Sequence, residues 1–241
     1  MIHMILFDLD GTLLPMDQEV FTRAYFRRLA EKLAPRGYDP EQLVKGIWEG
    51  TEAMVRNDGS RTNEEAFWDC FSRRFGERVL ADKPVFEAFY REDFPSLAQV
   101  CGHNSQAAET VRSLRQQGFR LALATNPIFP AVATESRVRW TGLEPEEFEL
   151  ITTYENTSFC KPNPSYYRDI LLRLGCRGEE CLMVGNDAQE DLAAREAGIE
   201  VFLLTDCLIN KTNRPIAGCP QGGFADLRRY ISERAEERKQ P

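Results

Sequence analysis

The sequence predicts an α/β fold, in which a doubly wound parallel sheet carries an all-helical segment inserted after its first strand. Short apolar runs bounded by Gly, Asn or Asp have the character of buried parallel strands, and they occupy residues 4–7, 119–124, 181–184 and 201–204. A helical pattern precedes each of the last three runs, as in βαβ units. Between residues 15 and 101 the strand pattern is absent.

The inserted segment is predicted to form about four helices, because Pro and Gly residues divide it and its aromatic residues recur at helical spacing. Thr62 followed by Glu65 is a capping box, which predicts the start of the helix that carries Phe67, Trp68 and Phe71. We therefore predict two domains: a sheet-containing core formed by residues 1–14 and 102–241, and a helical domain formed by residues 15–101.

The helical patterns of the core each end at a glycine in the C′ position, and they span residues 104–117, 165–174 and 189–197. In a doubly wound sheet, ligands bind at the carboxyl ends of the strands. Residues that directly follow the strands are therefore the candidate functional residues. The charged residues after Glu233 predict a frayed, solvated helix end.

Composition and charge restrict the class of protein. The 42% hydrophobic and 28% charged content is that of a soluble globular chain, without an apolar stretch long enough for a membrane span. The first residues lack a basic leader and a cleavage site, and the seven cysteines are odd in number without a CxxC pair, so we expect a cytoplasmic protein. A formal charge of −8 argues against a nucleic-acid partner.

The stretch ILFDLDGTLL, residues 5–14, places two carboxylates at the end of the first predicted strand. Positions i and i+2 of a strand point to the same face, so we expect Asp8 and Asp10 to aim at one spot. Two buried carboxylates repel each other unless a cation or a shared proton compensates. Gly11 permits a sharp turn, and Thr12 supplies a hydroxyl that ties down the loop.

A second acidic pair occurs in MVGNDAQEDL, where Asp187 and Asp191 are four residues apart at a predicted helix start and therefore on one face. Taken alone, such residues are as well explained as helix caps. Together with the first pair they indicate a metal site, because octahedral Mg²⁺ takes oxygen ligands from several loops, alongside water and substrate phosphate. Magnesium is the natural compensating ion.

Two further stretches can bind an anion. The strand RLALATN ends at Thr125 and Asn126, whose hydroxyl and backbone N–H groups can hold phosphate oxygens near the following helix. The stretch CKPNP stiffens the chain around Lys161 and gives its ammonium a fixed position. A threonine at a strand end is commonly a cap, and most lysines are merely solvated. Each feature therefore indicates anion binding only together with the other and with the two acidic pairs.

In this order, DLDGT, the strand ending in Thr125, Lys161 and GNDAQED closely resemble the four motifs of the haloacid dehalogenase-like hydrolase superfamily. The resemblance covers residues 1–14 and 102–205. It implies a Rossmann-like core, and the insertion resembles the helical cap domain of that superfamily.

The resemblance implies a role for each acidic residue. Asp8 is expected to be the nucleophile that forms an aspartyl-phosphate, and Asp10 the general acid and base. Asp187 and Asp191 match the residues that hold or orient Mg²⁺. Asp8 and the main-chain carbonyl of Asp10 are expected to complete the metal ligands.

The resemblance also implies a phosphate-binding set. Thr125 and Lys161 are similar to the phosphate-binding residues of the superfamily, and Thr12 and Asn126, beside them in the motifs, complete the substrate-binding residues that we predict. The expected partner is a small phosphorylated metabolite, hydrolysed as a phosphate monoester.

Other reactions of the superfamily fit less well. Members that cleave carbon–halogen bonds lack the second aspartate, which Asp10 supplies here. Phosphonate cleavage uses a cap lysine, for which Lys32 or Lys45 is available, and it stays an alternative, as does a phosphate-binding module with little catalysis. Phosphosugar mutases use a cap histidine, and no histidine lies between Leu14 and Cys101.

Substrate specificity is expected to come from cap side chains that face the core. The candidates are Trp48, Arg56 and Arg61. The Gly- and Pro-rich loop of residues 206–223 is expected to rim the site.

Overall fold

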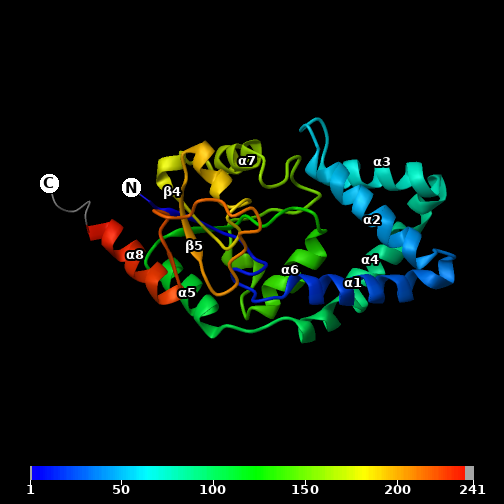
Figure 1. The fold of residues 1–241 in the computed structure, drawn as a ribbon, viewed down its shortest axis with the longest axis horizontal. Coiled ribbons are helices and arrows are strands. Elements are labelled where there is room, and N and C mark those ends of the chain that lie inside the picture. The colour runs from blue at the N-terminus through cyan, green and yellow to red at the C-terminus, as the bar shows by residue number, and fades with distance from the viewer. Residues whose placement is uncertain (1, 237–241) are drawn as a thin grey trace.

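The computed structural model describes residues 2–236 and shows a six-stranded, all-parallel sheet with the order β3-β2-β1-β4-β5-β6 (Figure 1). The strands are β1 (Met4–Phe7), β2 (Arg120–Leu123), β3 (Leu150–Ile151), β4 (Cys181–Gly185), β5 (Glu200–Leu204) and β6 (Gln221–Gly222). The predicted doubly wound parallel sheet is confirmed. The sequence did not reveal β3 and β6, because two residues are too few to show a periodic pattern.

Helices cover both faces of this sheet. They are α5 (Ser105–Gln116), α6 (Ala131–Trp140), α7 (Pro164–Leu174) and α8 (Phe224–Glu236). Side chains alternate along β1, so Ile5 and Phe7 pack with residues of α5 and α8, whereas Met4 and Leu6 pack with residues of α7. The helices predicted at residues 104–117 and 165–174 are confirmed. The predicted fraying after Glu233 falls largely on residues 237–241, outside the described residues.

The helix predicted at residues 189–197 is wrong. The chain forms a turn over residues 187–191 and then a 3₁₀ helix, Leu192–Ala197. Side-chain contacts explain the difference: Asp187 Oδ1 accepts the backbone N–H groups of Gln189 and Glu190, at 2.7 and 2.9 Å, and Asp191 Oδ2 accepts that of Asp187, at 2.9 Å. These bonds replace the first turn of an α-helix.

The inserted segment is helical, as predicted. Its α-helices are α1 (Gln18–Leu33), α2 (Pro40–Val55), α3 (Asn63–Phe75) and α4 (Lys83–Glu92), joined by 3₁₀ helices at Ala34–Arg36, Glu77–Asp82 and Phe94–Val100. The capping box is confirmed, since Thr62 Oγ1 accepts the N–H of Glu65 at 3.2 Å and Glu65 Oε2 accepts that of Thr62 at 2.8 Å.

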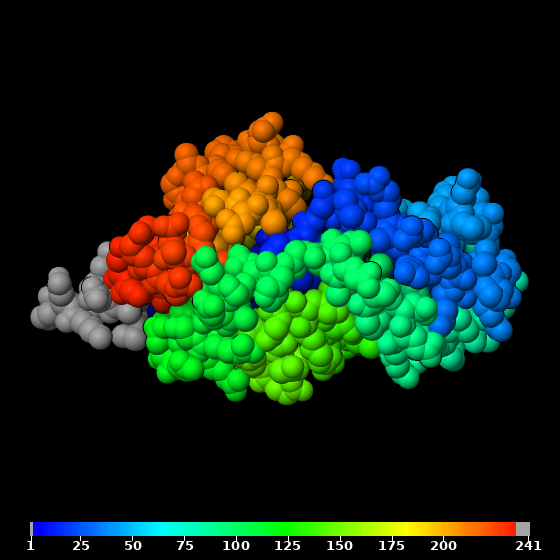
Figure 2. Space-filling model, turned by 90° about the horizontal axis from the view of Figure 1, so that it is seen from below, coloured from blue at the N-terminus to red at the C-terminus, as the bar shows by residue number. Residues whose placement is uncertain are grey.

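The helical segment packs around an aromatic core at one end of the molecule, away from α8 (Figure 2). Ala133 and Cys160 of the sheet-containing part also belong to this core. The two points where the chain crosses into the segment lie side by side: Met16 pairs with Cys101, and the N–H of Gly102 donates to the carbonyl of Pro15 at 2.7 Å. We propose these crossings as the boundaries of a cap domain.

Two further features of the structure are the apolar content of its helices and the state of its cysteines. None of the helices within residues 2–236 has the length and apolar content that a membrane crossing requires. All seven cysteines carry free thiols.

The capping box gives a test of the helical segment. Thr62→Ala removes the acceptor for the N–H of Glu65, and we expect the free energy of unfolding to fall by about 1 kcal/mol in urea titrations. Thr62→Ser keeps the acceptor and is the matched control. Equal losses in both variants would contradict the role of the cap.

Candidate active site

A cavity of about 740 Å³ lies between the carboxyl ends of the strands and helices α1–α4. The sheet-containing part contributes four separate stretches to its lining, which follow β1, β2, β3 and β4. Their polar side chains include Asp8, Asp10, Thr125, Asn126, Glu155, Asp187 and Asp191. Because the parallel strands end at the same edge of the sheet, residues distant in the sequence meet here.

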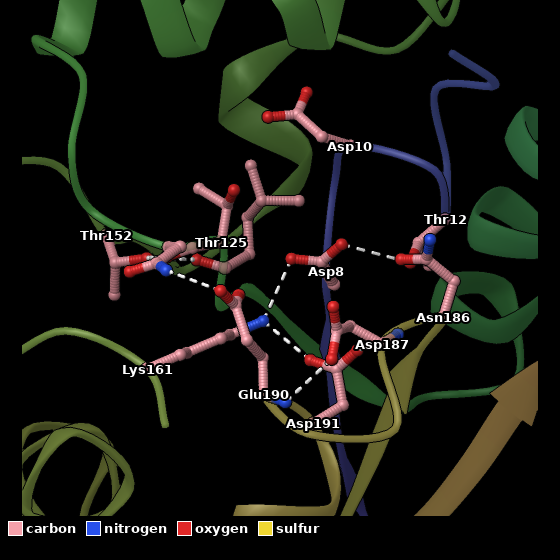
Figure 3. Close-up of polar contacts among 12 residues, drawn as sticks. Asp8, Asp10, Thr12, Thr125, Thr152, Lys161, Asn186, Asp187, Glu190 and Asp191 are labelled. Carbon is pink, nitrogen blue, oxygen red and sulfur yellow. Dashed lines mark hydrogen bonds and ion pairs between the residues drawn. The ribbon is translucent and has the colours of Figure 1, made fainter. Parts of the chain in front are cut away.

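Lys161 links two of these stretches through Asp8 and Asp191 and is itself absent from the lining (Figure 3). Its ammonium Nζ lies 2.9 Å from Asp8 Oδ1 and 2.7 Å from Asp191 Oδ1, and its side chain is fully buried. Burial alone would lower the pKa of Lys161, but the charges of Asp191 and Asp8 raise it well above its ordinary value. Lys161 is therefore a permanent cation directly beneath Asp8.

The carboxylate of Asp8 is held from both sides. Thr12 Oγ1 donates toward Asp8 Oδ2 at 3.0 Å and lies 2.9 Å from Asn186 Oδ1. Burial raises the pKa of Asp8 to about 6, against the opposing effect of Lys161, so the group is ionised above that pH. The hydroxyl of Thr12 ties down the loop, as predicted. Its single hydrogen is already shared between these oxygens, so the geometry does not favour Thr12 as a substrate-binding residue.

Asp10 departs from the prediction that it shares one spot with Asp8. Strand β1 ends at Phe7, Asp10 lies in the turn that follows, and its side chain points away from the Asp8 carboxylate (Figure 3). Asp10 Oδ2 instead pairs with Arg137, which is 1% exposed and whose guanidinium lies 4.5 Å from the centre of the Phe129 ring. The alternation rule failed because the strand ended one residue before Asp8.

Asp187 and Asp191 lie in the turn after β4. Both oxygens of Asp191 already have partners, Lys161 and the N–H of Asp187. Gly185 allows this approach, since a Cβ there would stand 2.0 Å from Asp191 Oδ2. Asp191 thus positions Lys161 and the turn, while Asp187 caps the turn with one oxygen.

The loop after β2 contributes Thr125 and Asn126. Thr125 accepts two hydrogen bonds at its carbonyl, from Thr152 at 2.7 Å and Tyr166 at 2.8 Å, which fixes the loop while its side chain lines the cavity. Asn126 Nδ2 donates to Glu190 at 3.0 Å, and its buried Oδ1 has no hydrogen-bond partner within residues 2–236. Burial raises the pKa of Glu190 to about 8.

Three residues of the site, Asn186, Glu190 and Arg137, were not predicted from the sequence. Asn186 and Glu190 stand inside the GNDAQED stretch but were overlooked beside its two aspartates. Gly11, with φ of +84°, comes so close to Asn186 that a Cβ would lie 2.2 Å from Nδ2. Arg137 is a helical residue far from every motif, and no sequence signal marks it.

The donor set fits Mg²⁺, because Asp8 and Asp187 present hard carboxylate oxygens at the cavity, and a third acidic residue of its lining, Asp10, has a buried Oδ1 without a hydrogen-bond partner among the described residues. Between residues 2 and 236, no three His, Cys, Asp or Glu side chains form a ready-made metal-binding group. Mg²⁺ generally takes only one or two carboxylates and completes its shell with water and substrate phosphate. Asp8 and Asp187 can supply these carboxylates.

Of the cap residues predicted to set specificity, Trp48 lines the cavity. Arg56 and Arg61 are absent from its lining and pair with Glu52 and Asp69. The loop of residues 206–223 is also absent from the lining, contrary to expectation. It contacts the turn after β4 outside the cavity, where Asn186 Nδ2 donates to the carbonyl of Cys207 at 2.7 Å.

Comparison with known proteins agrees with this geometry. A model of the haloacid dehalogenase-like hydrolase family matches residues 2–198. The chain belongs to this family. Among similar hydrolases are the pyrophosphatase PpaX of Halalkalibacterium halodurans, 27% identical over 84% of this chain and 83% of the relative, and the phosphoglycolate phosphatase of Colwellia psychrerythraea, 26% identical over 84% of each.

Solved structures of the haloacid dehalogenase-like family share the fold. The crystal structure of CbbY from Rhodobacter sphaeroides in complex with phosphate superimposes with a TM-score of 0.57, at 22% identity, over 94% of this chain and 96% of that one. The match extends over nearly the whole of both chains, so the two proteins share the fold of the sheet and of the inserted helices.

The Arg137–Asp10 pair gives a test of the site's architecture. Arg137→Met leaves Asp10 without its partner and removes the contact with Phe129, and we expect the free energy of unfolding to fall by about 2 kcal/mol. Arg139→Ala, on the same helix, breaks only exposed ion pairs and is expected to cost less than about 0.5 kcal/mol. Urea unfolding measures both, and similar losses would argue against a structural role for the pair.

Proposed function

We propose that the chain is a Mg²⁺-dependent phosphatase that hydrolyses small-molecule phosphate monoesters through an aspartyl-phosphate on Asp8. The observation that carries the proposal is the Asp8 carboxylate at the base of the cavity, aimed by Lys161 and Thr12. A nucleophile needs a fixed direction and a negative charge: these contacts fix the direction, and the carboxylate is charged above its pKa of about 6.

In the first step, an oxygen of Asp8 attacks the substrate phosphorus and the bond to the ester oxygen breaks. Asp10 donates a proton to the departing oxygen, so the leaving group departs as a neutral alcohol. Because the Asp10 side chain points toward Arg137 here, this step requires it to turn toward the ester oxygen. The backbone turn at Gly11 places Asp10 on a loop, where such a rotation is local.

In the second step, Asp10 takes a proton from water, which attacks the phosphorus of the aspartyl-phosphate. The Asp8–phosphorus bond breaks, and inorganic phosphate and the free carboxylate result. Thr125 and Asn126, which line the cavity, bind and orient the phosphoryl oxygens, and the buried ammonium of Lys161 supplies positive charge beside Asp8. Asp8, Asp187 and the carbonyl of Asp10 would hold Mg²⁺, whose charge would offset the negative charge of the transferred phosphoryl group.

The names of the relatives, a pyrophosphatase and a phosphoglycolate phosphatase, support a small phosphorylated substrate. A cytoplasmic location is part of the proposal, in keeping with the seven free thiols.

The phosphonate-cleaving alternative needs a free cap lysine at the site. Lys32 and Lys45 do not line the cavity, and Lys32 pairs with Glu92 and Asp93. Lys83 does line it, but its ammonium pairs with Glu64 at 3.6 Å. These contacts favour the phosphatase.

The nucleophile assignment is testable with Asp8→Asn. We expect kcat with a generic aryl phosphate and Mg²⁺ to fall at least about 1000-fold, since the amide cannot form the acyl phosphate. Asp206→Asn changes an exposed carboxylate outside the cavity and serves as the matched control. Equal rates in wild type and Asp8→Asn would falsify the assignment, and a phosphate-binding module with little catalysis would then be the better description.

The acid role of Asp10 is testable through the leaving group. In Asp10→Asn, single-turnover release of glycerol from glycerol phosphate is expected to slow by about 100- to 10,000-fold. Release of dinitrophenol from its phosphate should slow far less, because that phenolate departs without a proton. Rapid-quench measurement of both alcohols decides the point, and an equal loss for both would refute proton donation by Asp10.

A further inference from the structure

The cavity is much larger than a phosphoryl group requires, and its far part is formed by the cap. Helices α1–α4 contribute aromatic rings to its lining, which we call the aromatic wall: Phe21, Phe26, Trp48, Trp68, Phe86 and Tyr90. Several are in mutual contact, with ring centres 5.6 Å apart for Phe26 and Trp48 and 5.3 Å for Trp68 and Phe86. The alcohol that leaves phosphorus when Asp8 attacks has this space beside it.

The charges around the aromatic wall disfavour a second anionic group on the substrate. Among the described residues of the lining, the basic side chains are Lys83 and Arg91, and each is paired with a glutamate, Glu64 at 3.6 Å and Glu87 at 3.2 Å. The ammonium of Lys83 also lies 4.8 Å from the centre of the Trp68 ring. A carboxylate or second phosphate that reached either cation would meet the neighbouring glutamate.

The same features favour an uncharged ring. Rings that stack against aromatic side chains gain both apolar burial and ring–ring attraction. A cationic alcohol would also be attracted to aromatic faces, but Lys83 already occupies the Trp68 face as a cation. An uncharged aromatic group therefore matches the remaining surface best.

We infer that the substrates are phosphate monoesters of uncharged aromatic or heteroaromatic alcohols, with the ring held against the aromatic wall. This inference rests on the proposed function, because it concerns the leaving group of the same reaction. It separates this chain from a role in hydrolysing pyrophosphate or phosphoglycolate, whose leaving groups are anionic.

The experiment compares alkyl esters with one another, so that recognition is not confused with leaving-group reactivity, and adds pyrophosphate as an anionic reference. With Mg²⁺, kcat/KM for 2-naphthylmethyl phosphate is expected to exceed that for ethyl phosphate by about 100-fold. 2-Phosphoglycolate and pyrophosphate should fall below 2-naphthylmethyl phosphate. Equal values for the naphthylmethyl and ethyl esters, or a preference for phosphoglycolate, pyrophosphate or phosphocholine, would overturn the inference.

Trp48 provides the variant, because it is 53% exposed and its truncation leaves the buried cap core in place. Trp48→Ala is expected to reduce the naphthylmethyl-to-ethyl ratio of kcat/KM by about tenfold. Leu172→Ala removes an even more exposed apolar side chain, on α7 outside the cavity, and should leave the ratio unchanged. An unchanged ratio in Trp48→Ala would contradict ring recognition at this wall.

Calorimetry on Asp8→Asn protein separates the two proposals. Tighter binding of 2-naphthylmethyl phosphate than of ethyl phosphate, without turnover of any ester by the wild type, would retain the aromatic ligand and reject the phosphatase. Turnover of all esters without discrimination would retain the phosphatase and reject the aromatic substrate class.

Discussion

The buried ion pairs of Lys161 with Asp8 and Asp191 are the interaction on which the site depends. They join three parts of the chain: the end of β1, the segment before α7 and the turn after β4. Removing an ammonium and two carboxylates from water costs several kcal/mol for each ion, which only close pairing can offset. The cluster carries one more negative than positive charge when Asp8 is ionised.

The sheet supplies the rigidity that this cluster needs. Strand β1 lies between β2 and β4 and is buried on both faces, so the loops that leave these strands start from fixed points. Close packing continues into the loops, where Gly11 and Gly185 allow Asn186 and Asp191 to approach the backbone. A side chain at Gly11 would displace Asn186, and one at Gly185 would displace Asp191. These two residues contact Thr12 and Lys161, which hold Asp8.

In the proposed reaction, the helical segment combines its own packing and recognition of the leaving group in one set of aromatic residues. Phe21 and Phe86 belong to its packed core and also face the cavity, whereas Trp48 is largely exposed. Recognition of the leaving group and stability of the cap are thus tied together at the buried positions and separable at the exposed one. The adjacent crossings at Met16 and Cys101 place this aromatic surface opposite the strand ends without making it part of the sheet.

The sequence by itself determined the four longer strands of the sheet, the inserted helices and the stretches that carry the site, because buried strands, capping boxes and glycine-terminated helices are local patterns. Only the tertiary structure decided what the side chains contact. Asp10 pairs with Arg137, the hydroxyl of Thr12 donates to Asp8, and the residues after Asp187 form a turn rather than a helix. In each case a partner distant in the sequence, or a competing side-chain hydrogen bond, outweighs the local preference, and no periodic pattern records such a partner.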